Sequence, residues 1–151
     1  MTTAPSTGIP RQLGHVALRV RDLDRAVGFY ANVVGLRLRH RGATAAFLGV
    51  REDASHELAL FALPEDAPGP EQSRVGMYHM AWEMESFEAL DQFHERLLAS
   101  GAQIAGYSDR QCNVMFLDPD GNELEAFWEP PSTASEHMGG APQPLPRLRR
   151  P

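Results

Sequence analysis

The sequence predicts an α+β fold made of two copies of one unit, in which a strand and a helix are followed by three more strands. Two pairs of related segments support this prediction. GHVALRV (14–20) matches YHMAWEM (78–84) at an offset of 64 residues, and HELALF (56–61) matches NELEAF (122–127) at an offset of 66. Helical periodicity and then short β-rich runs lie between the matched segments. Strands that follow one another without alternating helices are typical of an α+β fold rather than of one parallel sheet.

The first copy opens with a strand whose residues alternate between two faces. Its apolar face carries Val16, Leu18 and Val20. His15 therefore lies on the face that does not pack against the apolar layer. Asp22 is suited to cap the helix that follows, and Gly35 is suited to end it. The apolar side of this helix carries Leu23, Ala26, Val27, Tyr30 and Val34. Three strands are expected next, at about 36–41, 44–50 and 57–63.

The second copy repeats this order. Its first strand has an apolar face of Met80, Trp82 and Met84. This places His79 on the other face, as it does His15 in the first copy. Ser86 is suited to cap the second helix and Gly101 to end it. The packed side of that helix is expected to carry Phe87, Leu90, Phe93, Leu97 and Leu98. The last strands are expected at about 103–107, 113–118 and 123–128, with a turn at DPDG (118–121).

Composition changes along the chain predict the boundaries of these parts. We expect a mobile N-terminal tail at 1–11, a first βαβββ module at 12–63, a linker at 64–75, a second module at 76–129, and a mobile Pro-rich C-terminal tail at 130–151. The two modules are expected to form one domain.

Bulk properties exclude several classes of function. The chain has 151 residues and a net charge of −6, which gives no reason to expect nucleic acid or an anionic membrane as a partner. One cysteine, Cys112, excludes an internal disulfide and fits a reducing cytoplasm. The N-terminus lacks the pattern of a signal peptide, and no apolar segment is long enough to span a bilayer.

Two stretches carry a resemblance to a known family. GHVALRVRDLDRAVGFYANVVGL and FLDPDGNELEAF, within a duplicated βαβββ pattern, resemble the vicinal oxygen chelate superfamily. This superfamily includes glyoxalase I, extradiol catechol dioxygenases, epimerases and bleomycin-type resistance proteins. The resemblance implies a cupped eight-stranded mixed sheet, helices on the outside and a cavity where the modules meet. Single-domain members similar to catechol 2,3-dioxygenase are the nearest in pattern.

The resemblance also implies a metal site. The family's ligand positions fall on His15, His79 and Glu125, and its fourth position falls on Ala59, which cannot bind a metal. Strand parity supports Glu125 independently, because its apolar neighbours Leu124, Ala126 and Trp128 lie on the other face. Two histidines and one carboxylate form the facial triad of non-haem Fe(II) oxygenases. We therefore expect Fe(II), with Mn(II), Zn(II), Ni(II) or Co(II) as alternatives.

The implied reaction is extradiol ring cleavage of a catechol-like aromatic by dioxygen. SHELALF resembles the segment that carries an acid–base histidine in catechol-cleaving enzymes, which falls on His56; the alternative role for His56 is to cap its strand. The family's tyrosine falls on Met115, which cannot donate a proton, so Tyr107 or Asp109 is a substitute candidate. Aromatic and sulfur side chains expected to line the substrate pocket are Phe47, Met115 and Phe127.

Other functions remain open at this point. One alternative is a metal-dependent isomerase, epimerase or lyase of the same superfamily, and another is a non-catalytic drug-binding resistance protein. A homodimer is expected, because superfamily members often pair. Among the remaining residues, His94 is expected on a helix surface, and Met77 and Trp82 are expected in the core.

Overall fold

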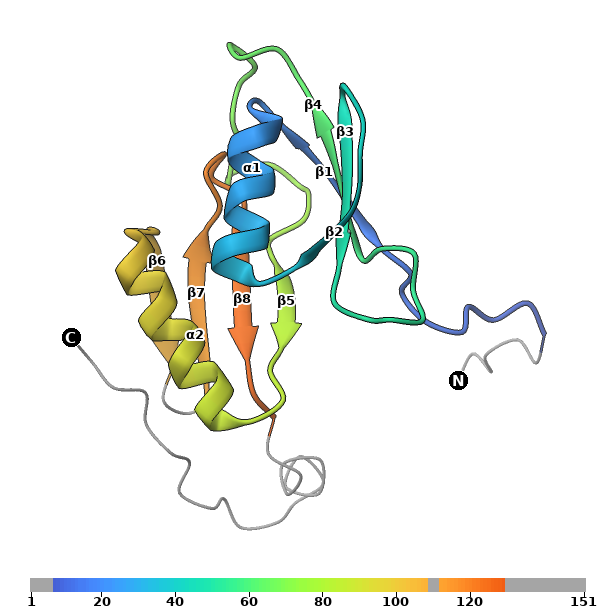
Figure 1. Cartoon of the computed structure of the whole chain (residues 1–151). Coiled ribbons are helices and arrows are strands. Elements are labelled where there is room, and N and C mark those ends of the chain that lie inside the picture. The colour runs from blue at the N-terminus through green and yellow to red at the C-terminus, as the bar shows by residue number, and fades with distance from the viewer. Residues whose placement is uncertain (1–6, 109–111, 130–151) are drawn as a thin grey trace.

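The computed structural model describes residues 7–108 and 112–129 and contains both βαβββ units (Figure 1). The first unit comprises β1 (Val16–Val20), α1 (Leu23–Phe29), η1 (Tyr30–Val34), β2 (Arg37–Arg41), β3 (Ala45–Gly49) and β4 (Leu58–Ala62). The second comprises β5 (Met80–Glu83), α2 (Phe87–Ser100), β6 (Ile104–Ser108), β7 (Asn113–Leu117) and β8 (Glu123–Phe127). The predicted α+β class and the repeated order of elements are confirmed. The two predicted tails lie largely outside the described residues.

Hydrogen bonding divides the eight strands into two sheets of four, with the orders β1-β4-β3-β2 and β5-β8-β7-β6. In each sheet the first strand runs parallel to the last, β1 beside β4 and β5 beside β8, and the other neighbours are antiparallel. The register pairs Ala17 with Ala59 in the first sheet and Ala81 with Glu125 in the second. β1 and β5 are thus edge strands of their sheets within the described chain.

The first helix begins and ends where the sequence predicts. The Asp22 carboxylate accepts a hydrogen bond of 2.9 Å from the Arg25 N–H. From Tyr30 to Val34 the helix continues with the wider π geometry, which is uncommon and is found mostly as single turns. It ends at Gly35, whose φ of 94° favours glycine because other residues are strained in this region.

The second helix has the predicted caps and a different buried face. Ser86 Oγ accepts from the Ala89 N–H at 3.1 Å, and Gly101 ends the helix in the left-handed conformation. His94 is only 1% exposed, so the expectation of a surface position is wrong. Leu98, expected in the packed face, is 41% exposed. The buried positions are Leu90, Phe93, His94 and Leu97, and Leu98 lies about 100° further round the helix from Leu97.

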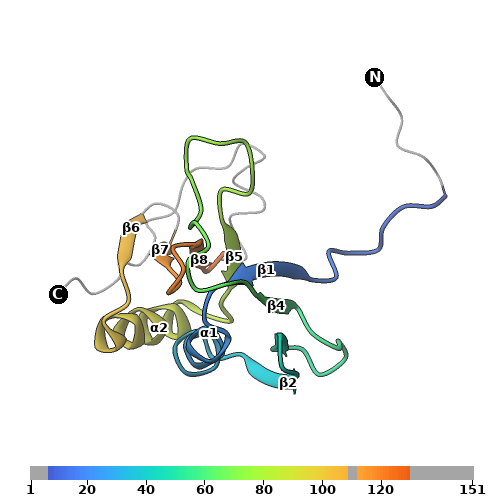
Figure 2. The same cartoon turned by 90° about the horizontal axis from the view of Figure 1, so that it is seen from above.

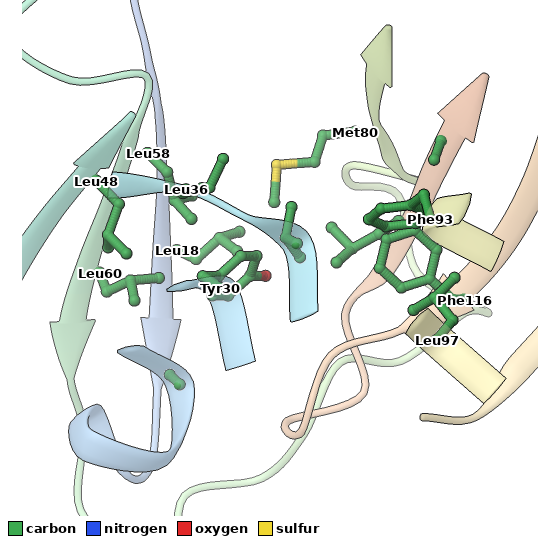
Figure 3. Close-up of a cluster of buried hydrophobic side chains, with 14 of the residues drawn as sticks. Leu18, Tyr30, Leu36, Leu48, Leu58, Leu60, Met80, Phe93, Leu97 and Phe116 are labelled. Carbon is green, nitrogen blue, oxygen red and sulfur yellow. The ribbon is translucent and has the colours of Figure 1, made fainter. Parts of the chain in front are cut away.

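One hydrophobic core joins the two units (Figure 3). Both sheets contribute their apolar faces to it, and α1 and α2 lie next to each other (Figure 2). Consequently the faces that carry His15 and Glu125 are turned away from this core, as strand parity predicts. Trp82 packs at the edge of the core, whereas Met77 is 54% exposed, so its expected core position is wrong.

Two polar contacts, one of them fully buried, join the second unit to the first. The Tyr30 hydroxyl, fully buried, donates to Asp118 Oδ2 at 2.8 Å, and Arg21 Nε donates to Asp120 Oδ1 at 2.8 Å. Burial, with the nearby Asp118 carboxylate as a second cause, raises the pKa of Tyr30 well above its ordinary value near 10. Asp118 also closes its own turn by accepting from the N–H groups of Asp120 and Asn122. The DPDG segment therefore forms the predicted turn and also joins the modules.

No helix in the described part of the chain is long and apolar enough to cross a membrane.

Candidate metal centre

The second module brings two of the predicted ligands together. His79 immediately precedes β5, and Glu125 lies in the middle of the adjacent strand β8. His79 Nε2 is 3.1 Å from Glu125 Oε2, and the two side chains are 29% and 16% exposed. His79 Nδ1 is buried without a hydrogen-bond partner among the described residues. The pair is thus partly shielded from water and has its imidazole and carboxylate directed at each other.

The separation of these two atoms fits a shared divalent ion. Two ligand atoms bound at about 2.1 Å and at a right angle lie about 3.0 Å apart. The observed 3.1 Å agrees with that value. Imidazole nitrogen and carboxylate oxygen also form the donor set that suits Fe(II), Mn(II) and Zn(II).

Glu125 has further neighbours on the same face of the sheet. Met115 of β7 is its direct cross-strand partner, and Phe127 follows two residues along β8. Two of the three expected pocket residues, Met115 and Phe127, therefore lie on the same face as the carboxylate. Asn113 of β7 donates its side-chain amide to Glu125 Oε1. Asn113 was not predicted as a site residue, although its parity with Met115 places it on this face.

The first module forms a matching cluster without a carboxylate. The rings of His15 and His56 lie 4.7 Å apart between centroids, and Phe47 lies 5.0 Å from His56. Ala59 is the cross-strand partner of Phe47. Ser55 Oγ is 3.0 Å from His56 Nδ1, which orients that imidazole. The structure thus brings His15, His56 and Phe47 together. Ala59, at the position equivalent to Glu125, lies next to Phe47 on the neighbouring strand.

The predicted three ligands do not meet within one chain. Over residues 7–108 and 112–129, no group of three or more His, Cys, Asp or Glu side chains is arranged to hold a metal. His15 lies with His56 on the first sheet, and Glu125 lies with His79 on the second. The physical reason is the shared core, because both sheets direct their apolar faces into it, so the opposite faces, which carry the candidate ligands, point away from it.

Tyr107 does not face Glu125. Its cross-strand partner is Val114, which is fully buried on the helix side of the sheet, and its ring lies 5.9 Å from that of His94. The sheet therefore separates Tyr107 from the carboxylate of the same chain, so its proposed role as proton donor there has no geometric support. The other candidate, Asp109, lies outside the described residues.

A groove of ≈ 970 Å³ runs between the modules but does not include the His79–Glu125 pair. Its walls come from β1, the end of β4, the linker and the β7–β8 turn: Ala17, Arg19, Phe61, Pro68, Gly69 and Asp120 are among them. A smaller hollow of ≈ 300 Å³ lies beside His15 and His56, with Arg11 and Arg51 at its rim. Neither hollow is lined by His79 or Glu125.

Comparison with known proteins agrees with this architecture. Residues 12–126 match the family model of the Glyoxalase/Bleomycin resistance protein/Dioxygenase superfamily. The chain belongs to this superfamily.

Individual relatives within the superfamily have different activities. Catechol-2,3-dioxygenase of Bacillus subtilis is 29% identical over 123 residues, which cover 79% of this chain and 42% of that protein. Glutathione transferase FosA of Serratia marcescens is 32% identical over 119 residues, covering 76% of this chain and 79% of that one. A glyoxalase/dioxygenase structure from Nostoc punctiforme aligns with a TM-score of 0.70 at 24% identity over 86% of this chain and 99% of that one, which supports the fold alone. The chain thus spans less than half of the dioxygenase and most of the transferase.

Proposed function

We propose that this protein is a metal-dependent enzyme whose metal centre is completed by two copies of the chain. In this proposal one copy supplies His79 and Glu125, and the other supplies His15. The observation that carries it is the contact of 3.1 Å between His79 Nε2 and Glu125 Oε2, combined with the placement of His15 on the other module's outer face. A centre of three ligands then needs a second chain.

A two-fold symmetric dimer would bring the His79–Glu125 pair of each copy next to His15 of the other copy. In such an interface each patch meets the other copy's complementary patch, so two identical centres form. Exposed apolar residues next to the edge strands support an interface between two chains at these strands. Leu13 is 79% exposed, and Val75 and Tyr78, just before β5, are also exposed. Exposed apolar groups beside an unpaired strand edge are typical of an interface.

For the reaction, we infer extradiol ring cleavage of a catechol-like aromatic, with dioxygen as co-substrate and Fe(II) as the metal. Bound Fe(II) would supply the redox chemistry and hold the substrate's two oxygens. His56, whose ring contacts Ser55 Oγ, would take a proton from the substrate. Phe47 from one copy, with Met115 and Phe127 from the other, would form the walls for the ring. A cytoplasmic location is part of this proposal.

A mixing experiment tests the shared centre. His15→Ala and Glu125→Ala chains are unfolded together and refolded as a mixture, and bound Mn(II) is measured. With random reassortment half of the dimers pair the two variants, and each has one intact centre of two, so about a quarter of wild-type metal is expected. Each variant alone should hold almost none. His40→Ala, an exposed histidine on β2, is the matched control and should bind metal normally.

Two results would contradict this proposal. If native mass spectrometry shows mixed dimers and they hold no more metal than the single variants, the shared centre is wrong. Full metal binding by His15→Ala alone would exclude His15 as a ligand.

The reaction is tested separately with Fe(II)-loaded protein and a panel of catechols in an oxygen electrode. Oxygen uptake matched by a coloured ring-opened product is expected, and Glu125→Ala should abolish both. Metal-loaded protein that consumes no oxygen with any catechol would exclude ring cleavage and leave the metal centre intact.

A second candidate is transfer of a thiol to an electrophilic substrate. It is supported by the FosA relative, because the match spans 79% of that protein, and by Met115 at the position of the family's tyrosine. Loss of free glutathione when Mn(II) and a small electrophilic substrate such as an epoxide are added, without any need for oxygen, would favour this candidate over ring cleavage.

A further inference from the structure

The two oxygens of Glu125 have different neighbours. Oε2 faces His79 Nε2, whereas Oε1 accepts a hydrogen bond from the side-chain amide of Asn113. We propose that Asn113 is a positioning residue: it occupies Oε1, so that Oε2 is the oxygen that binds the metal. This inference rests on the metal centre proposed above and adds a residue that controls it.

The geometry of the strands supports a specific contact between these residues. Asn113 is paired with Phe127, and Glu125 is paired with Met115, so Asn113 reaches Glu125 diagonally across β7 and β8. Such diagonal neighbours lie about 7–8 Å apart along the backbone and touch only when their side chains point toward each other. Asn113 is 6% exposed, so water competes little for its amide.

The duplicated module provides an independent comparison. Phe127 corresponds to Phe61 and Glu125 to Ala59 at the offset of 66 residues. Ala45 pairs with Phe61 as Asn113 pairs with Phe127, so Ala45 holds the position equivalent to Asn113. The first module thus lacks both the carboxylate and the amide. The two groups are present together in one copy and absent together in the other, which agrees with a positioning role.

The amide has a defined physical effect on the carboxylate. A neutral donor fixes one oxygen without cancelling the negative charge that attracts a cation. It also limits rotation of the carboxylate, so less conformational entropy is lost when the metal binds. A carboxylate restricted to one ligating oxygen occupies a single coordination position and leaves others open for substrate.

Titration of the full-length chain with Mn(II) alone tests this role, with free Mn(II) followed by electron paramagnetic resonance. Asn113→Leu keeps a similar volume and removes the donor, and it should weaken Mn(II) binding about 10- to 100-fold, as loss of a hydrogen-bond partner of a ligand usually does. Leu117→Met, on the same face of β7 but paired with Glu123 and outside the proposed site, is the matched control and should leave the affinity unchanged. Asn113→Gln, which retains an amide donor, should recover part of the loss.

Two further measurements separate positioning from general damage. The free energy of unfolding of metal-free Asn113→Leu should fall by less than the loss of metal-binding free energy. The far-ultraviolet circular dichroism of metal-free Asn113→Leu should match that of the wild type. Asn113→Ala gives the same comparison if leucine prevents folding.

The outcomes distinguish this inference from the proposed function. Wild-type protein that binds no Mn(II) would overturn both. Wild-type protein that binds Mn(II) together with Asn113 variants that bind it equally well would overturn the role of Asn113 alone. An equal loss of affinity in the Leu117→Met control would also overturn it.

Discussion

Tyr30→Phe isolates one hydrogen bond that holds the two modules together. The substitution removes only the hydroxyl that donates to Asp118 Oδ2 at 2.8 Å. The ring is retained, so no large cavity forms and the apolar packing of Tyr30 in the core is preserved. Any change in stability therefore comes mainly from the lost donor.

The expected magnitude follows from what remains at Asp118. A hydrogen bond to a carboxylate contributes about 1.5–3 kcal/mol. Asp118 still accepts hydrogen bonds from the Asp120 N–H, the Asn122 N–H and Asn122 Nδ2 after the change. These three donors continue to stabilise its negative charge. We therefore expect a loss near the lower limit, about 1.5 kcal/mol in the free energy of unfolding.

Urea unfolding, followed by circular dichroism, measures this loss. Ser73→Ala is the matched control, because its hydroxyl donates to the Glu71 carboxylate at an exposed position of the linker, and its free energy of unfolding should change by less than about 0.5 kcal/mol. The slope of free energy against urea should be the same for all three proteins. A Tyr30→Phe protein as stable as wild type, or a control with an equal loss, would refute the assigned role of this hydrogen bond.

Three other predictions concern the same core. The wild-type free energy of unfolding should decrease as pH rises above about 10, because Tyr30 ionises in the unfolded chain while its raised pKa keeps it neutral in the folded one; urea midpoints of Tyr30→Phe should depend less on pH in that range, and equal slopes would contradict this. Leu97→Ala should cost about 2–5 kcal/mol because Leu97 is fully buried, and Leu98→Ala should cost far less; equal urea midpoints would show that the helix faces are assigned wrongly. His94→Leu should not lower stability, since both ring nitrogens of this buried histidine lack partners in the described structure; a loss above about 1 kcal/mol in calorimetry would argue against it.

The positions of helices and strands follow from the sequence more closely than the surroundings of individual side chains do. Strand and helix positions agree with the sequence to within a residue or two, because caps, turns and periodicity act over a few neighbouring residues. His94 falls at i+4 from Leu90, so its burial was visible in the helical spacing, although its polar ring argued against it. The π turn at Tyr30–Val34 has no comparable local signal.

The candidate site shows the same division. Parity placed His15, His79 and Glu125 on the outer faces of their strands, because alternation along a strand is a local property. Parity did not reveal that the Tyr107 side chain lies on the helix side of the sheet. This position depends on the register of β6, which is shifted by an irregularity between Ile104 and Gly106. The contact between Asn113 and Glu125 likewise depends on the register between two strands.

The sequence by itself determined the duplicated unit, the alternation of its strands and the chemical types of the candidate ligands. Only the tertiary structure decided which of these candidates share a face of one molecule. Packing both sheets on one core, with Tyr30 and Arg21 bound to the DPDG turn, directs His15 and Glu125 to different outer surfaces. That outcome depends on contacts between residues nearly 100 positions apart in the chain, which no local pattern encodes.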